Sequence, residues 1–392
     1  MSKSIFSLML AAGLLLGMCA TLDAQQTYDG MFGKGIHVVA QDSSYAMKVN
    51  FRTQSLMTYD GVSSNWLVRR MRLKLSGFAH SPRLQYKVEL GLSNRDHGGE
   101  SPETSNTSNL ILDAFVRYKV AGNLELWLGQ TKLPGNRERV ISSQKLQFVD
   151  RSLLNSRFNL DRDMGVQLRN TWSFGSVVTR QALAISQGEG RNRTLGNQGG
   201  LDYTGRLEVL PMGEFAGQGD YFGADLMREE RPRLALGLTY DYNDGAARQK
   251  GNTGSYVPDT ATNSLSTVLA DFMFKYRGLS VMGEYASKAA TGERLFDGEA
   301  LVSNYYTGTG VNIQAGYLFE SDYEWAVRYT AIRPELDSAR DLQDMYTLGL
   351  SKYIVGHSLK LQSDVSYVIE TNQQTALASG TYLFRFQMEL AF

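Results

Sequence analysis

One stretch of the chain, residues 132–163, concentrates side chains that could bind an anion. It reads KLPGNRERVISSQKLQFVDRSLLNSRFNLDRD and carries seven basic residues against four acidic ones, a net charge of +3. Guanidinium groups bind anions through charge-assisted, often bidentate hydrogen bonds. Leu146, Phe148, Leu153, Leu154 and Phe158 are unusual in a solvated loop, so we expect this connector to fold inward and pack against a wall.

A second interpretation of the same residues stays open. The arginines could pair with nearby carboxylates such as Asp150 and Asp161 and only brace the connector. In that case the segment would shape a passage without itself attracting anions. The sequence alone leaves the two interpretations about even.

The elements around this connector are predicted by a two-residue alternation. In TYLFRFQMELAF, residues 381–392, every second side chain from Tyr382 to Phe392 is apolar, and Arg385, Gln387 and Glu389 lie between them. Such alternation is typical of a strand with one apolar and one polar face. About 16 segments show it, and they span residues 44–55, 67–78, 84–93, 109–119, 123–131, 164–172, 176–186, 201–210, 233–243, 265–276, 279–288, 308–318, 322–333, 344–354, 358–370 and 381–392.

The connectors between these segments alternate between long and short. Outer-membrane barrels show this pattern, because their periplasmic turns are short and their extracellular loops are long. The sequence therefore predicts an all-β, transmembrane antiparallel β-barrel of about 16 strands, closed so that every backbone amide is paired in lipid. Residues 211–232 should form a short turn but number 22, and the pattern does not explain this exception. A secreted soluble all-β protein is the weaker alternative, because it would expose too much apolar surface.

A barrel of about sixteen strands leaves an aqueous channel, whose inward side chains set selectivity. Strand phase assigns 15 basic and 10 acidic residues to the inward face, although the whole chain has 40 of each. We therefore expect a mildly basic interior. The candidate pore-lining and anion-binding residues are Arg70, Arg72, Lys74, Arg137, Arg139, Lys145, Arg151 and Arg157.

The N-terminus has the features of a secretory signal peptide. Lys3 precedes an apolar centre, and a small-residue cleavage site ends at Ala24. A lipoprotein site at Cys19 is the alternative, disfavoured by the bulky Met18. We expect residues 1–24 to be the signal peptide, residues 25–43 a short N-terminal periplasmic segment, and residues 44–392 the barrel with its inward-folded loop 132–163.

Other classes of function have less support. The four histidines are His37, His80, His97 and His357, and only His97 falls in an outer loop. No serine or metal-ligand constellation accompanies it, so we predict no enzyme, no catalytic residues, no metal and no cofactor. Nucleic-acid binding lacks a basic face or motif. A barrel that binds a surface or takes part in secretion assembly, rather than an open channel, remains the alternative.

The chain resembles the phosphate-selective porins O and P, in the branch common among Bacteroidetes. The resemblance is carried by GKGIHVVAQDSSYAMKVNFRTQ at 33–54, WLVRRMRLKLSGFA at 66–79, GQTKLPGNRERVISSQKLQFVDRSLLNSRFNLDRDMGVQL at 129–168, GDYFGADLMREERPRLALGLTYDYN at 219–243 and GHSLKLQSDVSY at 356–367. The fourth stretch includes the long connector that breaks the loop pattern. The family implies a 16-stranded trimeric barrel with an inward third loop, in the outer membrane of a Gram-negative bacterium.

The family resemblance does not fix the solute. Phosphate selectivity in its name-giving members rests on a dense ladder of arginine and lysine, whereas acidic residues intervene here. We therefore expect a general or weakly anion-selective porin for small hydrophilic solutes. The expected partners are outer-membrane lipids, small anions, two further copies of the chain, and the barrel-insertion machinery, which would read the terminal Phe392.

Overall fold

The computed structural model describes residues 24–25, 32–93, 110–194, 196–257, 262–292, 294–297, 300–335 and 340–392. The expected signal peptide, apart from Ala24, and the loop histidine His97 lie outside these residues. The signal peptide and the boundaries drawn around it therefore stay predictions.

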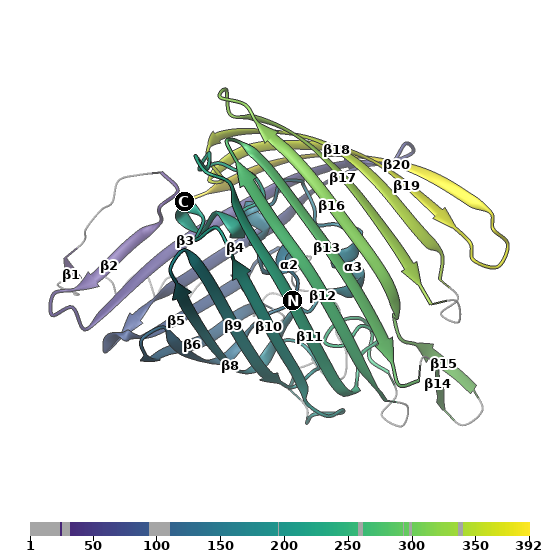
Figure 1. Ribbon diagram of the computed structural model, residues 1–392, viewed down its shortest axis with the longest axis horizontal. Coiled ribbons are helices and arrows are strands. Elements are labelled where there is room, and N and C mark those ends of the chain that lie inside the picture. The colour runs from purple at the N-terminus through teal and green to yellow at the C-terminus, as the bar shows by residue number, and fades with distance from the viewer. Residues whose placement is uncertain are drawn as a thin grey trace, which may run out of the picture.

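Sixteen strands in the described part of the chain form one closed antiparallel barrel, which confirms the predicted fold class and strand number. They are β3 (Tyr45–Tyr59), β4 (Ser64–Ala79), β5 (Ser81–Gly91), β6 (Ile111–Ala121), β7 (Leu124–Lys132), β8 (Arg162–Phe174), β9 (Val177–Ser186), β10 (Asp202–Leu210), β11 (Arg233–Ala246), β12 (Asn263–Tyr276), β13 (Leu279–Ala290), β16 (Gly308–Leu318), β17 (Tyr323–Pro334), β18 (Leu342–Val355), β19 (Leu359–Thr371) and β20 (Ala378–Ala391). The strands run obliquely around the barrel (Figure 1).

The last strand closes the barrel against the first. β20 pairs antiparallel with β3 from Phe384 opposite Tyr59 to Ala391 opposite Arg52. Beyond this ladder the Phe51 amide donates to the Phe392 carbonyl at 2.7 Å, and the Phe392 amide donates back at 2.9 Å. Closure leaves no free strand edge in lipid, where an unpaired amide would cost several kcal/mol, on the order of a lost hydrogen bond in hydrocarbon.

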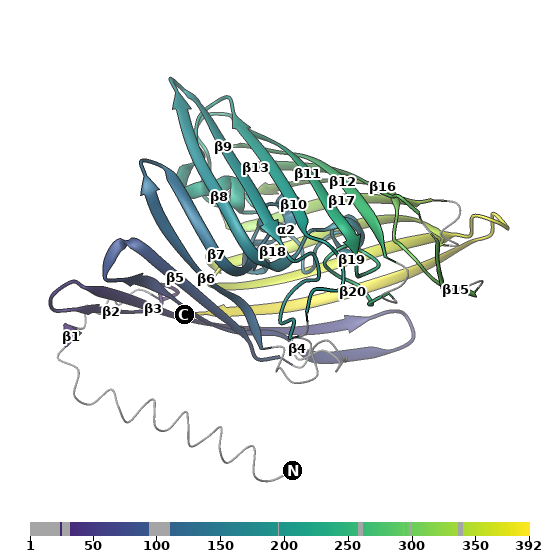
Figure 2. The same ribbon diagram turned by 90° about the horizontal axis from the view of Figure 1, so that it is seen from below.

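Four shorter strands lie outside this ring. β2 (Ile36–Ala40) pairs with the start of β3 and extends the sheet past the C-terminus, and β1 (Ala24–Gln25) pairs with β2. β14 (Arg294–Asp297) and β15 (Ala300–Asn304) form a hairpin in the connector between β13 and β16. Both hairpins project beyond the barrel wall in Figures 1 and 2.

The two faces of each strand have the polarity that the alternation predicts. On β11, Leu236, Leu238 and Tyr240 point outward and are about half exposed, whereas Ala235 and Thr239 point inward and are buried. On β20, Tyr382 is 63% exposed, and Arg385 and Glu389 face inward. Among the described residues, no helix has the length and hydropathy needed to cross a lipid bilayer.

One irregularity on β4 changes the charge of the interior. Gln54 pairs with Arg70 but the next residue, Ser55, pairs with Val68, so Arg69 is the extra residue of a β-bulge. A bulge turns two consecutive side chains to one face of a strand. Arg69 and Arg70 therefore both point into the barrel, and Arg69 is only 5% exposed.

Two connectors fold into the barrel. The first, called the inner loop here, comprises residues 133–161 and contains α2 (Arg137–Val140), the short helix η3 (Ser143–Lys145) and α3 (Leu153–Phe158). The second, called the inserted turn, comprises residues 211–232 between β10 and β11 and contains η4 (Ala216–Tyr221). α2 lies inside the ring of strands in both views (Figures 1 and 2), and α3 is labelled inside it in Figure 1.

The hydrophobic core lies inside the barrel, where these connectors meet the wall. Leu133, Leu154, Phe158 and Leu160 of the inner loop pack against Ala184, Leu269, Ala286, Tyr306 and Ile332. Ile141 and Leu146 of the inner loop join Phe215 of the inserted turn against Val178, Leu210, Ala235, Met273 and Met282. The apolar residues that looked out of place in a solvated loop are thus the contacts that hold it inside.

The ring of Phe392 generates a prediction about assembly. It lies 5.4 Å from the ring of Phe51 across the closing seam, between ring centroids. Deleting Phe392 removes this contact and two backbone hydrogen bonds, so we expect less heat-modifiable, folded barrel on gels of outer-membrane fractions. The channels that do assemble should keep the wild-type conductance.

The matched control is Phe392→Tyr, which keeps the ring and the backbone pairing. It should assemble like the wild type. Normal levels of folded barrel in the deletion variant would show that the terminal ring has no part in assembly.

Candidate functional site

The inner loop is fastened to one half of the barrel wall. The Gln147 amide donates to Ser280 Oγ and Glu324 Oε1 at 2.8 and 2.7 Å, on β13 and β17. The backbone amide of Val149 donates to Asp364 Oδ2 on β19 at 3.1 Å. These contacts join a single loop to strands that are distant in sequence, so the loop fills the half of the barrel formed by β10 to β20.

A buried ion cluster forms the centre of this attachment. Arg137 is fully buried, with its guanidinium 2.8 Å from Asp271 Oδ1, 3.3 Å from Glu208 Oε1 and 3.7 Å from Asp220 Oδ2. Burial alone would lower the pKa of Arg137, but the carboxylates of Asp271 and Glu208 raise it above its ordinary value. Arg137 therefore braces the loop and does not face solute.

The inserted turn supports the inner loop from the side of the short turns. The Lys145 ammonium lies 3.6 Å from the centroid of the Phe222 ring, and the Gly223 amide donates to the Lys145 carbonyl at 2.8 Å. Lys275 on β12 donates to the carbonyls of Gly219 and Ala224 at 2.8 and 2.6 Å. The long connector that breaks the loop pattern is thus a structural support inside the barrel.

The far edge of the inner loop reaches across to β3, β4 and β20. Asp150 bonds to Arg69 and lies 3.4 Å from Arg70 and 3.5 Å from Arg385. Burial opposes ionisation of the Asp150 carboxyl, but Arg70 and Arg69 lower its pKa to about 2. The carboxylate therefore stays charged under all physiological conditions and ties the loop edge to three strands.

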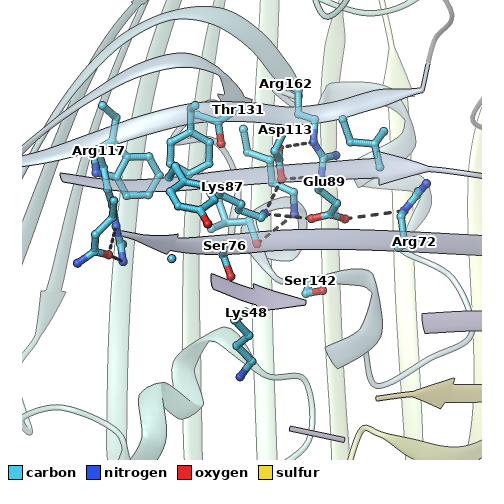
Figure 3. Close-up of a pocket in the computed structure, with 18 of the residues that line it drawn as sticks. Lys48, Arg72, Ser76, Lys87, Glu89, Asp113, Arg117, Thr131, Ser142 and Arg162 are labelled. Atoms are coloured by element: carbon cyan, nitrogen blue, oxygen red, sulfur yellow. Dashed lines mark hydrogen bonds and ion pairs between the residues drawn. The ribbon is translucent and has the colours of Figure 1, made fainter. Parts of the chain in front are cut away.

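The half of the barrel that the inner loop leaves open is a basic cavity of about 840 Å³. Among the described residues, thirteen lysines and arginines line it against three acidic residues, an excess of ten. The basic residues are Lys48, Arg52, Arg69, Arg70, Arg72, Lys87, Arg117, Lys132, Arg139, Arg151, Arg162, Arg169 and Arg191, and the acidic ones are Glu89, Asp113 and Asp161. Figure 3 shows part of this wall.

Each carboxylate in the cavity is shared between cations. Asp113 lies 2.5 Å from Lys87 Nζ and 2.6 Å from Arg162 Nε, and Glu89 lies 3.0 Å from Lys87 Nζ and 3.8 Å from Arg72 Nε (Figure 3). Asp161 accepts from Arg139 Nε at 2.9 Å. Because each acid is outnumbered by its neighbours, the network stays positive.

Five cations of the cavity have no carboxylate within 4.0 Å in the part of the chain that the structure describes: Lys48, Arg117, Lys132, Arg151 and Arg169. Lys132 and Arg151 donate instead to carbonyls at the end of α2, at 2.7 Å to Arg139 and 2.7 Å to Ile141 respectively. Burial and the neighbouring guanidinium of Arg139 lower the pKa of Arg151 well below its ordinary value. An anion in the cavity would relieve this repulsion.

The structure separates the eight candidate residues into two groups. Arg70, Arg72, Arg139 and Arg151 line the basic cavity, and Lys74 lies beside them on the inward face of β4. Arg137, Lys145 and Arg157 lie elsewhere: Arg137 is in the buried cluster, Lys145 is under the inserted turn, and Arg157 Nη2 donates to Gln343 at 3.2 Å. The bracing interpretation therefore holds for Arg137, and Arg139 also pairs with Asp161. That Arg70, Arg72, Lys74, Arg139 and Arg151 bind anions stays a prediction.

Arg69 is the lining residue that sequence phase misplaces. Strict alternation from Arg70 and Arg72 would turn Arg69 toward lipid, where a guanidinium is costly. The sequence could have shown this, because two adjacent arginines in a membrane-spanning strand would place one in lipid unless a bulge turns both inward. The other unexpected cation, Arg191, follows β9 in a connector that shows no strand pattern.

Comparisons with known proteins agree with this architecture. The family model described as phosphate-selective porin O and P matches residues 48–392. An uncharacterized protein of Aquifex aeolicus (strain VF5) is 24% identical over 334 residues, which are 78% of this chain and 76% of the relative.

Solved structures are similar in fold. OmpT of Vibrio cholerae in its trimer form has a TM-score of 0.54 at 11% identity, over 89% of this chain and 100% of that one. The outer membrane channel DcaP of Acinetobacter baumannii gives 0.55 at 11% identity, over 90% and 99%. Salmonella typhi OmpF in complex with daunomycin gives 0.54 at 10% identity, over 89% and 98%. At these identities the likeness shows the fold alone.

The tie at Asp150 generates a prediction about stability. Changing Asp150→Asn leaves the buried Arg69 without a carboxylate within 4.0 Å among the described residues, whereas Arg385 keeps Asp364 at 2.6 Å. Breaking a buried pair in this way costs about 3 kcal/mol. We expect a lower unfolding temperature in detergent and more frequent spontaneous closures in single-channel records, because the loop edge is released.

Asp344→Asn is the matched control, since Asp344 pairs at 2.8 Å with Arg333, whose side chain is 42% exposed. Exposed pairs contribute only about 0–1 kcal/mol. If both variants unfold and gate like the wild type, Asp150 does not hold the loop edge.

Proposed function

We propose that this chain, which belongs to the phosphate-selective porin O and P family, forms a water-filled channel for passive diffusion of small hydrophilic solutes and prefers anions. The family places the barrel in the outer membrane of a Gram-negative bacterium, and it supports the proposal of a channel rather than an enzyme. The preference for anions is the part of the proposal that rests on this chain's own residues.

The observation that carries the proposal is the separation of charge inside the barrel. Strand phase alone assigns 10 acids against 15 bases to the interior. Many of those acids, such as Glu208, Asp271 and Asp364, are buried against the inner loop. The open half retains three acids among thirteen bases, so a solute meets a positive wall although the chain as a whole is neutral.

The physical consequence is a raised local concentration of anions. A cleft lined by one sign of charge and bounded by low-dielectric walls focuses the field and attracts counter-ions. Conduction also requires that the solute leave again, so binding must stay weak. Glu89 and Asp113 both pair with Lys87 and so reduce the positive charge of the wall. This weaker attraction favours a general anion preference over tight binding of phosphate.

We also propose that the chain assembles as a homotrimer. Support comes from the similar fold of Vibrio cholerae OmpT, which was solved in a trimer form. Native mass spectrometry of protein extracted in mild detergent tests this, and a monomer at every detergent concentration would contradict it.

Reversal potentials across planar bilayers test the anion preference. Under a gradient of potassium chloride, we expect the sign of an anion-selective pore. Changing Arg139 and Arg151 together to Gln removes two lining cations, so the reversal potential should move toward zero. Reversal potentials in potassium phosphate should rank the variants in the same order. The conductance should not saturate at low phosphate concentration.

Arg333→Gln serves as the control, because Arg333 lies outside the lining of the cavity and its side chain is 42% exposed. It should behave like the wild type. Cation selectivity in the wild type, or the absence of open channels, would overturn the proposal and favour a role in binding or assembly.

A further inference from the structure

A second cavity of about 560 Å³ adjoins the basic one and is lined on one side by Pro134 and Val140 of the inner loop. Four residues line both: Arg117 on β6, Trp127 on β7, Arg169 on β8 and Val140 at the end of α2. The two cavities therefore meet in a gap with two sides. The barrel wall contributes the guanidinium groups of Arg117 and Arg169 and the indole of Trp127, and the inner loop contributes the side chain of Val140. No carboxylate is among these four shared residues.

Trp127 is an unusual residue for the wet face of such a barrel. Its ring stacks on Phe115, with centroids 4.8 Å apart and planes 14° apart. Both side chains point inward, although aromatic residues in membrane barrels are typical of the outer girdles. The pair presents a half-buried apolar strip beside the charged residues of this wall.

The backbone is shaped to let the two rings meet. Gly129 lies opposite Phe115 with φ of +126°, a conformation that side-chain-bearing residues rarely adopt. A Cβ there would lie 2.4 Å from the Ala114 carbonyl oxygen and 3.0 Å from Phe115 Cβ. Glu125 fixes the indole from the other side by accepting from Trp127 Nε1 at 2.9 Å.

Two cations flank this aromatic strip. The guanidinium carbon of Arg169 lies 4.4 Å from the Trp127 ring centroid and that of Arg117 lies 5.8 Å away. Arg117 Nε donates to Gln85 at 2.7 Å, and Arg169 Nη2 donates to Gln167 at 2.8 Å. For both arginines, no hydrogen bond from Nη1 is found among the described residues, so each keeps donors for a solute.

We propose that the junction of the two cavities is a binding subsite for organic anions with a flat apolar body, the class to which aromatic carboxylates belong. This inference rests on the proposed anion channel and specifies which anions it favours. The carboxylate would lie between Arg117 and Arg169, and the apolar body against the Trp127 and Phe115 ring edges and Val140.

The subsite differs from the rest of the cavity in what it recognises. Among the described lining residues, a stacked aromatic pair lies here beside two cations that have no carboxylate within 4.0 Å. The guanidinium carbons of Arg169 and Arg117 lie 4.4 and 5.8 Å from the Trp127 ring centroid, so one small organic anion can contact the ring and a cation together. An anion of the same charge but without an apolar body would lose the aromatic contact and keep only the ionic one.

Block of chloride current by added potassium benzoate and potassium acetate tests the proposal in planar bilayers. Both carry one carboxylate, so a purely electrostatic wall treats them alike. In the wild type we expect benzoate to reach half-block at a lower concentration than acetate. Trp127→Leu should raise the half-blocking benzoate concentration about two- to tenfold, the range of a typical aromatic contact, and leave acetate unchanged.

Trp127→Phe should retain most of the wild-type block by benzoate, because it keeps an aromatic ring. A mere change of pore width would instead alter the block by acetate together with the block by benzoate. Trp325→Ala, on the lipid-facing side of β17 and 50% exposed, controls for general effects of losing a tryptophan. Arg117→Gln and Arg169→Gln should weaken block by both carboxylates.

The outcomes separate the subsite from the channel itself. An anion-selective wild type in which benzoate and acetate block equally, or in which Trp127→Leu leaves benzoate block unchanged, overturns the subsite and leaves the anion channel standing. A wild type without anion preference overturns the proposed function, whatever benzoate does.

Discussion

The buried attachment of the inner loop is the interaction on which the interior depends. Arg137 bonds to Asp271 and Glu208, which belong to different strands, and the loop on either side of it covers the same half of the wall. Removing one partner of such a pair would leave a buried charge uncompensated, which typically costs about 3–5 kcal/mol. The loop is therefore held to one side of the barrel and cannot easily shift to the other.

That placement decides the electrostatics of the passage. The inner loop has more basic than acidic residues, and it covers the half of the wall that is rich in carboxylates. The loop cations and the wall carboxylates neutralise each other where they are buried. What remains open is the half formed by β3 to β8, where lysines and arginines predominate. A chain with 40 basic and 40 acidic residues can in this way present one sign of charge to a solute. The inserted turn contributes through Phe222, whose ring packs against the ammonium group of Lys145.

Much of the fold could be predicted from the sequence. Lipid on one side of each strand and water on the other require apolar and polar side chains to alternate residue by residue. The sixteen strands and their inward faces follow from it, and so does the inward turn of a loop rich in Leu and Phe. The bulge at Arg69 does not follow, since it breaks the period on which the prediction depends. Nor could Arg137 be told from Arg139 two residues later. One is buried among carboxylates of distant strands and the other faces the cavity, and only the three-dimensional arrangement separates them.

The central claim is that solute has access to the basic half of the barrel and is excluded from the half behind the inner loop. Cys19, the one cysteine of the chain, lies in the predicted signal peptide, so single cysteines can report on each half. The direct measurement is the rate at which an anionic sulfonate and a cationic trimethylammonium thiol reagent modify Ser76→Cys and Thr131→Cys, which line the cavity, and Ser280→Cys and Ser351→Cys, which are buried beside Gln147. We predict faster modification by the anionic reagent at the first pair and no modification of the second pair in the folded barrel. Faster modification by the cationic reagent, or equal access to both halves, would contradict the account.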